Sequence, residues 1–440
     1  MKNQNNESRR DFVINSSIMA GGLMTAPLLS KANFFSGAED TIKVAVVGCG
    51  GRGTGAAMQA LSSKQNVKIV AMCDAFKDNL DNCHKELTEE INNSIGDLAK
   101  RLDVPEERRF TGFDGYKKAI ALADVVILAT PPGFRPIHFE EAINQGKHVF
   151  MEKPVATDPA GVQKVLATAA IAKQKKLNVV VGLQRHYQNS YRELFKRKDL
   201  IGDITSMQAW WDNDGVWTRP RKAGQTEMEY QMRNWYYFNW LCGDHITEQH
   251  IHNLDVINWF KGGYPVKAQG FGGRQVRTSK EHGEIFDHHF VEFEYADGSI
   301  LNSQCRHMPG TMSRVDELLI GTKGRIACGA AHIKDHSGKI IYQYDTKKEN
   351  NPYQTEHDEL FAAIAKGEYK FADAENGAKS TMTSILGRMA TYSGQMVYWD
   401  KAIHSGIDIH PKVYAWDATP PVVPNADGSY PIAIPGVTKY

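Results

Sequence analysis

The sequence has almost no net charge, few cysteines and no long uninterrupted apolar segment. Lysine and arginine together number 52 against 51 aspartates and glutamates, and no long run carries one sign, so nothing indicates a nucleic-acid or anionic-membrane partner. The six cysteines are scattered and form no C-x-x-C pair, which predicts free buried thiols and not a disulfide framework. These absences favour a small molecule as the ligand.

The chain is long enough for two domains. Of its 440 residues, 42% are hydrophobic, which is sufficient for one large core or two ordinary cores. We expect a signal and linker over residues 1–38, a nucleotide-binding domain over residues 39–184 and a substrate-binding domain over residues 185–440.

The first residues are typical of an export label. Residues 8–13 read Ser-Arg-Arg-Asp-Phe-Val, and a moderately apolar stretch continues to Leu29, which resembles a twin-arginine signal. Polar residues and glycines interrupt the stretch, so it predicts periplasmic export without stable membrane insertion. The resemblance implies export of an already folded protein, which suits a nucleotide loaded in the cytoplasm and kept tightly bound. A disordered basic tail is the alternative interpretation.

A glycine-rich turn follows the first strong strand signal. Ile42 to Val47 are nearly all apolar or β-branched, as expected for a strand buried on both faces of a parallel sheet. A G-x-G-x-x-G turn and a helical pattern come next, the context that a dinucleotide-binding turn requires. Gly48 would allow the tight turn, Gly50 the approach of a pyrophosphate to the backbone, and Gly53 close packing of the helix. The whole turn consists of Gly48, Cys49, Gly50, Gly51, Arg52 and Gly53.

The second apolar run ends at a carboxylate. Val67 to Met72 predict a strand, and Asp74 follows Gly53 by 21 residues, where a dinucleotide fold places the acceptor for the adenosine ribose hydroxyls. A carboxylate here would repel a 2'-phosphate, so NAD is favoured over NADP. Arg52 and Lys77 are near enough in the sequence to leave NADP open.

Strands and helices continue to alternate in the first half. We expect a strand over Asp124–Thr130, a helix over about Ile137–Gln145 and a strand over Lys147–Met151. This alternation is typical of a doubly wound parallel sheet, in which ligands bind beyond the carboxyl ends of the strands. Lys153 lies at such an end.

The chain resembles the Gfo/Idh/MocA oxidoreductase family. The glycine turn, Thr130-Pro131-Pro132, Gly146-Lys147-His148-Val149 and Glu152-Lys153-Pro154 occur in the family's order and spacing. The resemblance implies an α/β fold with an N-terminal Rossmann domain, a C-terminal α+β domain whose large, mostly antiparallel sheet covers the nicotinamide, and sugar-like substrates. The residues expected to bind the cofactor are Gly48, Gly50, Gly51, Arg52, Gly53, Asp74, Thr130, Pro131, Pro132, His138, Glu152 and Lys153.

The second half is consistent with such a sheet. Phe290 to Tyr295 alternate apolar and polar residues, and Ala296 to Ser299 form a hairpin signal. Glu356 to Ala365 and Ala374 to Val397 predict helices, which in the family return to pack beside the nucleotide domain. We also expect a homo-oligomer formed through the C-terminal sheet.

The segment from Gly243 to Asp255 concentrates histidines and acids and predicts the start of an amphipathic helix. Family members commonly carry Asp-x-Gly-x-His-x-x-Asp here. Aligned on His252 and Asp255, Glu248 replaces the family's aspartate and His250 its glycine. The substrate pocket should therefore differ from that of the simple sugar dehydrogenases.

We expect Lys153, His252 and Glu248 to carry the chemistry. Removal of a hydroxyl proton requires a base, and His252 can accept a proton near neutral pH without a large pKa shift. Lys153 is the alternative base if its own pKa is lowered, and otherwise it polarises the oxygen. Glu248 would orient or assist them. The residues expected to contact substrate are Arg185, Tyr191, Asp244, His245 and His250, although Arg185 could equally be a structural arginine paired with a carboxylate.

The same segment offers an alternative metal site. His245, Glu248 and His252 are spaced i, i+3 and i+7, so they would share one face of a continuous helix and could hold Zn²⁺ or Mn²⁺. The family resemblance explains these residues without a metal, and we expect none.

Three functions remain open at this stage. The leading hypothesis is an NAD-dependent oxidoreductase that acts on a secondary ring hydroxyl of a sugar or glycoside, with C3 as the expected carbon. The second hypothesis is an NAD-dependent glycosidase or lyase, in which transient oxidation acidifies the neighbouring C–H, a leaving group is eliminated and the hydride returns. The third is a non-catalytic sugar-binding protein that keeps NAD as a structural part.

Overall fold

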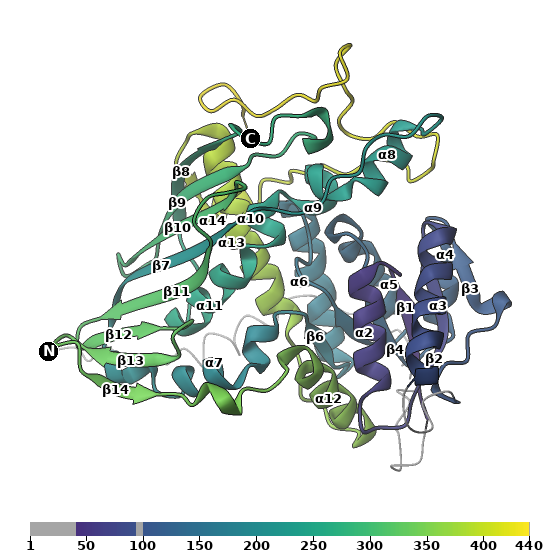
Figure 1. Ribbon diagram of the computed structural model, residues 1–440, viewed down its shortest axis with the longest axis horizontal. Helices are drawn as coiled ribbons and strands as arrows, with labels where there is room; N and C mark the ends of the chain where they lie inside the picture. Colours follow the sequence, from purple (N-terminus) through teal and green to yellow (C-terminus); the bar gives the residue numbers. More distant parts are fainter. Residues whose placement is uncertain (1–40, 94–99, 440) are drawn as a thin grey trace, which may run out of the picture. The chain divides into compact units, whose positions relative to one another are not determined.

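The computed structural model describes residues 41–93 and 100–439. These residues form two β-sheets with helices packed on them (Figure 1). The expected export signal and linker, residues 1–38, lie outside the described residues. The predicted α/β class, a parallel Rossmann sheet followed by a mostly antiparallel sheet, is confirmed.

The first sheet has six parallel strands in the order β3-β2-β1-β4-β5-β6. This is the strand order of dinucleotide-binding Rossmann domains. The strands are β1 (Ile42–Val47), β2 (Val67–Asp74), β3 (Arg109–Thr111), β4 (Val125–Leu128), β5 (His148–Met151) and β6 (Val179–Val181). Its helices are α2 (Gly51–Leu61), α3 (Lys77–Asn93), α4 (Gly115–Ala121), α5 (Arg135–Asn144) and α6 (Pro159–Gln174).

The sheet is buried on both faces, which explains its apolar strands. In β1, Val44 and Val46 belong to one hydrophobic cluster, whereas Ala45 and Val47 belong to the cluster on the other face. The strand predicted over Asp124–Thr130 is shorter at both ends, because the chain already leaves the sheet before the two prolines that follow.

The second sheet has nine strands in the order β14-β13-β12-β11-β7-β10-β9-β8-β15. Only the β7 and β10 pair is parallel. The strands are β7 (Ile204–Asn213), β8 (Lys267–Gly273), β9 (His288–Glu294), β10 (Ile300–His307), β11 (Arg314–Gly321), β12 (Gly324–Ala327), β13 (His332–Asp335), β14 (Ile340–Gln343) and β15 (Val397–Tyr398). The alternation predicted near residue 290 is confirmed, since every second side chain of β9 is buried and the hairpin closes through Gly298 at φ +81°.

Helices of the second half pack on this sheet and on the first domain. They are α7 (Asn189–Phe195), α8 (Glu227–Arg233), α9 (Asn239–Cys242), α10 (His245–Glu248), α11 (Ile251–Lys261), α12 (Pro352–Ala365), α13 (Ala374–Ser393) and α14 (Trp399–Ile403). α11 and α13 lie against the sheet, α12 contacts α2, and α13 contacts α6 (Figure 1). The division at residue 184 stays a prediction.

Two helix ends differ from the sequence expectation. α12 begins at Pro352, before the expected Glu356, because the Asn351 side chain accepts hydrogen bonds from the two following backbone N–H groups and proline fits the first turn. The expected helix to Val397 is wrong at its end. α13 stops at Ser393 because Gly394 adopts the left-handed conformation at φ +67°, and Val397 begins β15.

All six cysteines are free and buried, which confirms the prediction of thiols. Within residues 41–93 and 100–439, no helix is both long enough and apolar enough to cross a membrane.

Candidate active site

The glycine-rich turn joins β1 to α2 at the carboxyl edge of the parallel sheet. A Cβ on Gly48, at φ +98°, would lie 2.4 Å from the Thr130 nitrogen, and a Cβ on Gly53 would lie 1.8 Å from the Gly48 oxygen. These two glycines therefore keep the turn tight and the helix close to the strand. Gly50 and Gly51 have no neighbour within 4 Å of such an atom, so the backbone there is open to a ligand.

Asp74 ends β2 directly beside this turn. Its carboxylate accepts hydrogen bonds from the Cys49 N–H at 2.8 Å, the Phe76 N–H at 2.8 Å and the Asn79 amide at 3.2 Å. Burial raises the pKa of Asp74, and the backbone hydrogen bonds oppose that shift. The turn and the predicted ribose ligand are thus held together by one hydrogen bond.

The two cations near the turn are engaged with carboxylates. The Arg52 Nε lies 2.5 Å from Glu152 Oε1, and its Nη2 lies 3.4 Å from Glu356 Oε1 on α12. Lys77 pairs with Asp81 on the exposed side of α3 at 2.9 Å. Arg52 and Glu152, both predicted cofactor residues, therefore contact each other.

Further predicted cofactor residues follow β4. Thr130, Pro131 and Pro132 form the turn into α5, and the Thr130 hydroxyl lies 3.2 Å from His138 Nδ1. His138 is buried, and burial, followed by the charge of Arg135, lowers its pKa to about 3. His138 is therefore neutral at physiological pH.

Lys153 and Glu248 meet across the two halves of the chain. Lys153 follows β5, and its Nζ donates to the Glu248 carbonyl oxygen at 2.5 Å and to Glu248 Oε1 at 2.9 Å. Both side chains are almost buried. Burial raises the pKa of Glu248, and the ammonium of Lys153 opposes that shift. Among the described residues, Glu248 Oε2 has no hydrogen-bond partner.

His252 lies in the first turn of α11, where the charge of Lys153 acts on its ring. Its ring stacks on Trp211 with centroids 5.8 Å apart, and Nδ1 has no hydrogen-bond partner in the described part of the chain. Burial, then the charges of Lys153 and Arg185, hold the pKa of His252 well below its ordinary value. The expectation of a base without a large pKa shift is therefore wrong.

The segment predicted to form one helix is broken. α10 ends at Glu248 and α11 begins at Ile251, so His245, Glu248 and His252 do not share a helix face. They are not among the groups of described residues whose ligand atoms converge. The shared helix face on which the alternative metal site depended is wrong. His250 lies at the break, where its Nε2 is 2.7 Å from Ser303 Oγ on β10 and its side chain is fully buried.

Arg185 has a buried carboxylate partner, as one of the two sequence interpretations expected. It forms an ion pair with Glu317 on β11, and the Tyr191 hydroxyl donates to the same carboxylate at 3.0 Å. The Asn253 amide, next to His252, also donates to Glu317 at 2.7 Å. Sequence reasoning missed Glu317, because nothing in the β11 pattern distinguishes a buried carboxylate. It also missed His186, adjacent to Arg185, which pairs with Asp255 at 2.7 Å.

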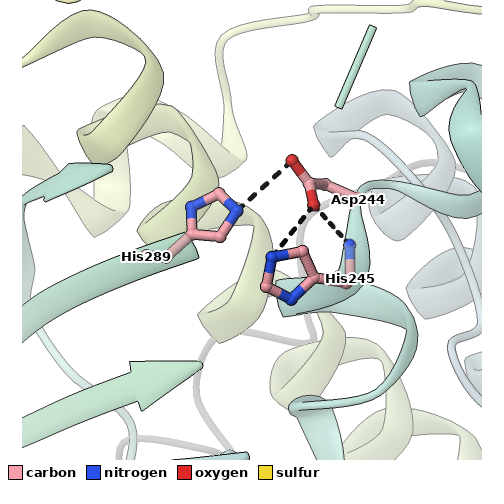
Figure 2. Close-up of side chains that lie close together, drawn as sticks. All are labelled: Asp244, His245 and His289. Carbon is pink, nitrogen blue, oxygen red and sulfur yellow. Dashed lines mark hydrogen bonds and ion pairs between the residues drawn. The ribbon is translucent and has the colours of Figure 1, made fainter. Parts of the chain in front are cut away.

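Asp244 and His245 lie apart from this network. Both are fully buried at the start of α10, beside His289 on β9 (Figure 2). Asp244 Oδ2 accepts from the Phe286 N–H at 3.0 Å and from the Tyr392 hydroxyl at 2.5 Å. Their predicted contact with substrate stays a prediction.

Comparison with known families identifies the first half of the chain. Residues 42–183 match the family model described as an oxidoreductase family with an NAD-binding Rossmann fold, Gfo/Idh/MocA. This part of the chain belongs to the Gfo/Idh/MocA family. The match includes the glycine turn, Asp74 and Lys153, and ends before His252.

Curated relatives extend the similarity. An inositol 2-dehydrogenase of Gluconacetobacter diazotrophicus is 28% identical over 244 residues, which cover 54% of this chain and 60% of the relative. A 2,7-anhydro-N-acetylneuraminate hydratase of Mediterraneibacter gnavus is 23% identical over 324 residues, 71% of this chain and 75% of the relative. The chain spans less than two thirds of the first relative's length.

Solved structures share the fold. The scyllo-inositol dehydrogenase of Lactobacillus casei with NAD(H) and scyllo-inositol superposes with a TM-score of 0.61 at 22% identity, covering 82% of this chain and 100% of that one. The aldose-aldose oxidoreductase of Caulobacter crescentus gives 0.63 at 18% identity, with coverages of 82% and 100%. The fold shared with these structures thus extends beyond the Rossmann domain.

Proposed function

We propose that this Gfo/Idh/MocA chain is an NAD-dependent oxidoreductase that acts on a secondary ring hydroxyl of a sugar or glycoside, with C3 as the expected carbon. The observation that carries the proposal is the buried junction of Lys153 with Glu248, beside His252, beyond the carboxyl end of β5. Ligands of open parallel sheets bind at this edge. The curated inositol dehydrogenases support a polyhydroxylated ring as substrate.

The residues at the glycine turn fit a dinucleotide. The open backbone at Gly50 and Gly51 would approach the pyrophosphate at the start of α2, and Asp74 would accept from the adenosine ribose hydroxyls. The charge of Asp74 favours NAD over NADP, and both Arg52 and Lys77 already pair with carboxylates. When bound, NAD accepts the hydride from the substrate carbon.

Side chains of the protein would accept the proton of the substrate hydroxyl and stabilise the oxygen that loses it. The lowered pKa of His252 leaves its ring neutral at physiological pH, so it has a lone pair to accept that proton. Lys153 would donate a hydrogen bond to the same oxygen and stabilise its developing negative charge. Glu248 holds the ammonium of Lys153 by two contacts and thereby fixes where that charge lies.

Tight retention of NAD is also proposed, and the C-terminal segment supports it. Trp416 packs on Phe76, two residues after Asp74, with ring centroids 4.9 Å apart, and on Phe113 at 4.6 Å. Arg233 lies over the Phe76 ring at 3.6 Å and pairs with Asp78 at 2.8 Å. These contacts pack residues of the second half on the loop beyond Asp74, which would oppose movement of that loop away from a bound nucleotide. Trp416→Ala should therefore raise the loss of NAD during gel filtration at least tenfold, and unchanged retention would contradict this part of the proposal.

A redox-neutral glycoside cleavage is the second candidate. It is favoured by the relative named as a hydratase, which matches 71% of this chain, and by the enclosed loop at Asp74. In this cycle, oxidation acidifies the C–H next to the ketone, a base removes that proton, the leaving group departs, water adds and the hydride returns. No second substrate is consumed in restoring the cofactor.

The first experiment identifies the nucleotide by mass spectrometry of the protein as purified, followed by a screen of glycosides. A dehydrogenase accumulates NADH and a keto-sugar in equal amounts, whereas redox-neutral cleavage releases the aglycone without net NADH. Absence of any bound or bindable nucleotide would refute both. NAD binding without turnover of any sugar would leave the third hypothesis, a sugar-binding protein.

Two further expectations remain proposals. Periplasmic export rests on residues 8–13, and a homo-oligomer through the C-terminal sheet is supported by Phe271, which is 65% exposed and stacks on Phe290 of the neighbouring strand at 5.1 Å. Light scattering of the purified chain would measure the oligomeric state, and a monomer would contradict that part of the proposal.

A further inference from the structure

A second polar cluster lies outside the proposed active-site network. It consists of Asp244 and His245 at the start of α10 and His289 on β9, with both rings turned toward the carboxylate (Figure 2). His245 Nε2 lies 3.8 Å from Asp244 Oδ1, and His289 Nε2 lies 3.3 Å from Asp244 Oδ2. One potential ligand atom from each residue lies within 4.8 Å of the others.

The cluster is fully buried, and its histidine ring nitrogens are not all satisfied, whereas the carboxylate of Asp244 accepts hydrogen bonds from its neighbours. All three side chains have no solvent exposure. Neither ring nitrogen of His245 has a hydrogen-bond partner among the described residues, nor has His289 Nε2. Buried polar groups in folded proteins nearly always have partners, and a carboxylate in the interior needs a positive charge. The arrangement is therefore suited to a cation that the free ring nitrogens and the carboxylate would bind together.

The hydrogen bond on the far side of His289 determines what its Nε2 can offer. His289 Nδ1 lies 2.9 Å from the Thr391 hydroxyl, whose only proton is within reach of the Gly387 and Arg388 carbonyl oxygens at 3.1 Å. Thr391 therefore accepts from the Nδ1–H of His289. Such a bond to the outer nitrogen is typical of metal-binding histidines, and it leaves the Nε2 lone pair aimed at Asp244.

We propose that Asp244, His245 and His289 bind one divalent transition-metal ion, with Zn²⁺ as the expected ion. Two imidazoles and one carboxylate are a common ligand set for such ions. Tetrahedral bonds of about 2.0–2.1 Å place ligand atoms about 3.3–3.4 Å apart. The separation of His289 from Asp244 is 3.3 Å, and His245 at 3.8 Å would have to move closer by about half an ångström. His307 stacks on His245 with ring centroids 4.4 Å apart, and its Nε2 has no hydrogen-bond partner among the described residues. It is a further nitrogen donor beside the three proposed ligands.

A second proton on His289 is the competing explanation. An imidazolium would neutralise Asp244 without a metal. It would still leave both nitrogens of His245 buried and unpaired, whereas a metal ion engages His245, His289 and Asp244 together.

The closed surroundings assign the ion a structural role. Its three ligands have no exposed side, so no position is open to a substrate. The ion would join α10 to β9, and the Tyr392 hydroxyl on α13 bonds the same carboxylate. Asp244 also has φ +70° and ψ 162°, a backbone region that non-glycine residues rarely adopt and that several bonds to its side chain would hold. Glu248, which binds Lys153, ends the same short helix.

Metal analysis of the full chain, expressed without a polyhistidine tag, tests the proposal. After loading with Zn²⁺ and exhaustive dialysis, we expect about one ion per chain by plasma mass spectrometry. His245→Ala and His289→Ala should each retain at least tenfold less zinc. His332→Ala, on β13 of the same sheet but outside the cluster, is the matched control and should bind like the wild type.

Two measurements on the wild type avoid dependence on variants that fail to fold. X-ray absorption at the zinc edge should show imidazole nitrogens at about 2.0–2.1 Å, and zinc should raise the melting temperature of the metal-free protein. Zinc retained undiminished in both folded variants, a spectrum without imidazole ligands, or a wild type that holds no zinc after loading would overturn the proposal. In the last case a protonated His289 would explain the pair. None of these results depends on hydride transfer, so the proposed function stands or fails separately.

Discussion

Replacement of His252 by alanine separates the proposed proton transfer from nucleotide binding. The side chain lies in α11 and stacks on Trp211, and no hydrogen bond or ring contact of the described residues joins it to the glycine turn or to Asp74, so the variant should keep its NAD. Loss of a positioned base should slow substrate oxidation by on the order of 10²–10⁴. This corresponds to about 3–5 kcal/mol of transition-state stabilisation.

Lys153 and His252 should act as one unit. Lys153→Ala removes the ammonium that Glu248 holds and that lies near the His252 ring, so we expect a comparable loss of rate. If both groups act on the same hydroxyl oxygen, the double variant should be little slower than either single variant. Multiplication of the two losses would show that they act independently.

The pH profile tests the electrostatics of the same site. Because burial and Lys153 lower the pKa of His252, the free enzyme should keep its base neutral below the ordinary histidine value of about 6.5. The value of kcat/KM should therefore stay flat as the pH falls from about 8 to about 6.

The assay follows NADH absorbance and keto-sugar formation in single turnovers, with bound nucleotide quantified for each variant. His332→Ala serves as the control for replacing a histidine elsewhere. Full activity in His252→Ala would exclude the general-base role. An acid limb centred near 6.5 in the wild type would refute the argument from burial.

The remaining predictions concern the cofactor, export and acid stability. Asp74→Ala should weaken NAD binding and relax discrimination against NADP in titrations, and unchanged affinity and preference would show that Asp74 is not the ribose ligand. Replacing Arg9 and Arg10 with lysine should leave the protein in the cytoplasm, and periplasmic recovery equal to wild type would contradict the twin-arginine interpretation. Buried neutral histidines take up protons on unfolding below about pH 6.5, so each should cost up to about 1.4 kcal/mol of stability per pH unit between about pH 6 and 4.5. Desolvation lowers the pKa of the buried His138 and His250 to about 3 and that of the half-buried His148 to about 4. Urea unfolding at pH 7 and 5.5 would measure the loss, and equal free energies of unfolding would contradict it.

The Rossmann half could be predicted because its signals are local. A strand buried on both faces must be apolar throughout, and the tight turn after β1 needs glycine at positions 48 and 53 for lack of space. The position of Asp74 at the end of β2 could be predicted from its spacing after Gly53. The C-terminal sheet was recognised at β9, where alternation is strong, but its nine-strand order depends on long-range pairing that no short pattern records.

The helix break after Glu248 could not be predicted. The expectation of an amphipathic helix is wrong, because α11 is buried on nearly every side, and apolar residues all round the helix do not mark where it starts. If the helix were continuous, the spacing of His245, Glu248 and His252 would place them on one helix face. In the structure His245 instead lies beside His289, which is 44 residues further along the chain (245 to 289). The two come together because His289 belongs to β9, a strand of the second sheet.

The partners of the charged residues could not be predicted from the sequence either. Whether Arg185 bonds substrate or a carboxylate depended on Glu317, and the pKa of His252 depended on how deeply α11 is covered. Both are properties of tertiary packing. The residue types at the site could be chosen from sequence, whereas their protonation could not.

The residues proposed for nucleotide binding and those proposed for proton transfer belong to different parts of the chain. The glycine turn and Asp74 both belong to the first sheet, so the proposed pyrophosphate and ribose contacts come from the first half, whereas Trp416 and Arg233 of the second half pack on the loop beyond Asp74. Lys153 also belongs to the first half, but the carboxylate that holds it and the proposed base stand on α10 and α11. The proposed hydride transfer would therefore need α10 and α11 of the second half in place beside Lys153. Asp244 and His245 come four and three residues before Glu248, and the carboxylate of Asp244 contacts His289 on β9 and Tyr392 on α13, so the cluster would keep α10 in place while substrate enters and leaves.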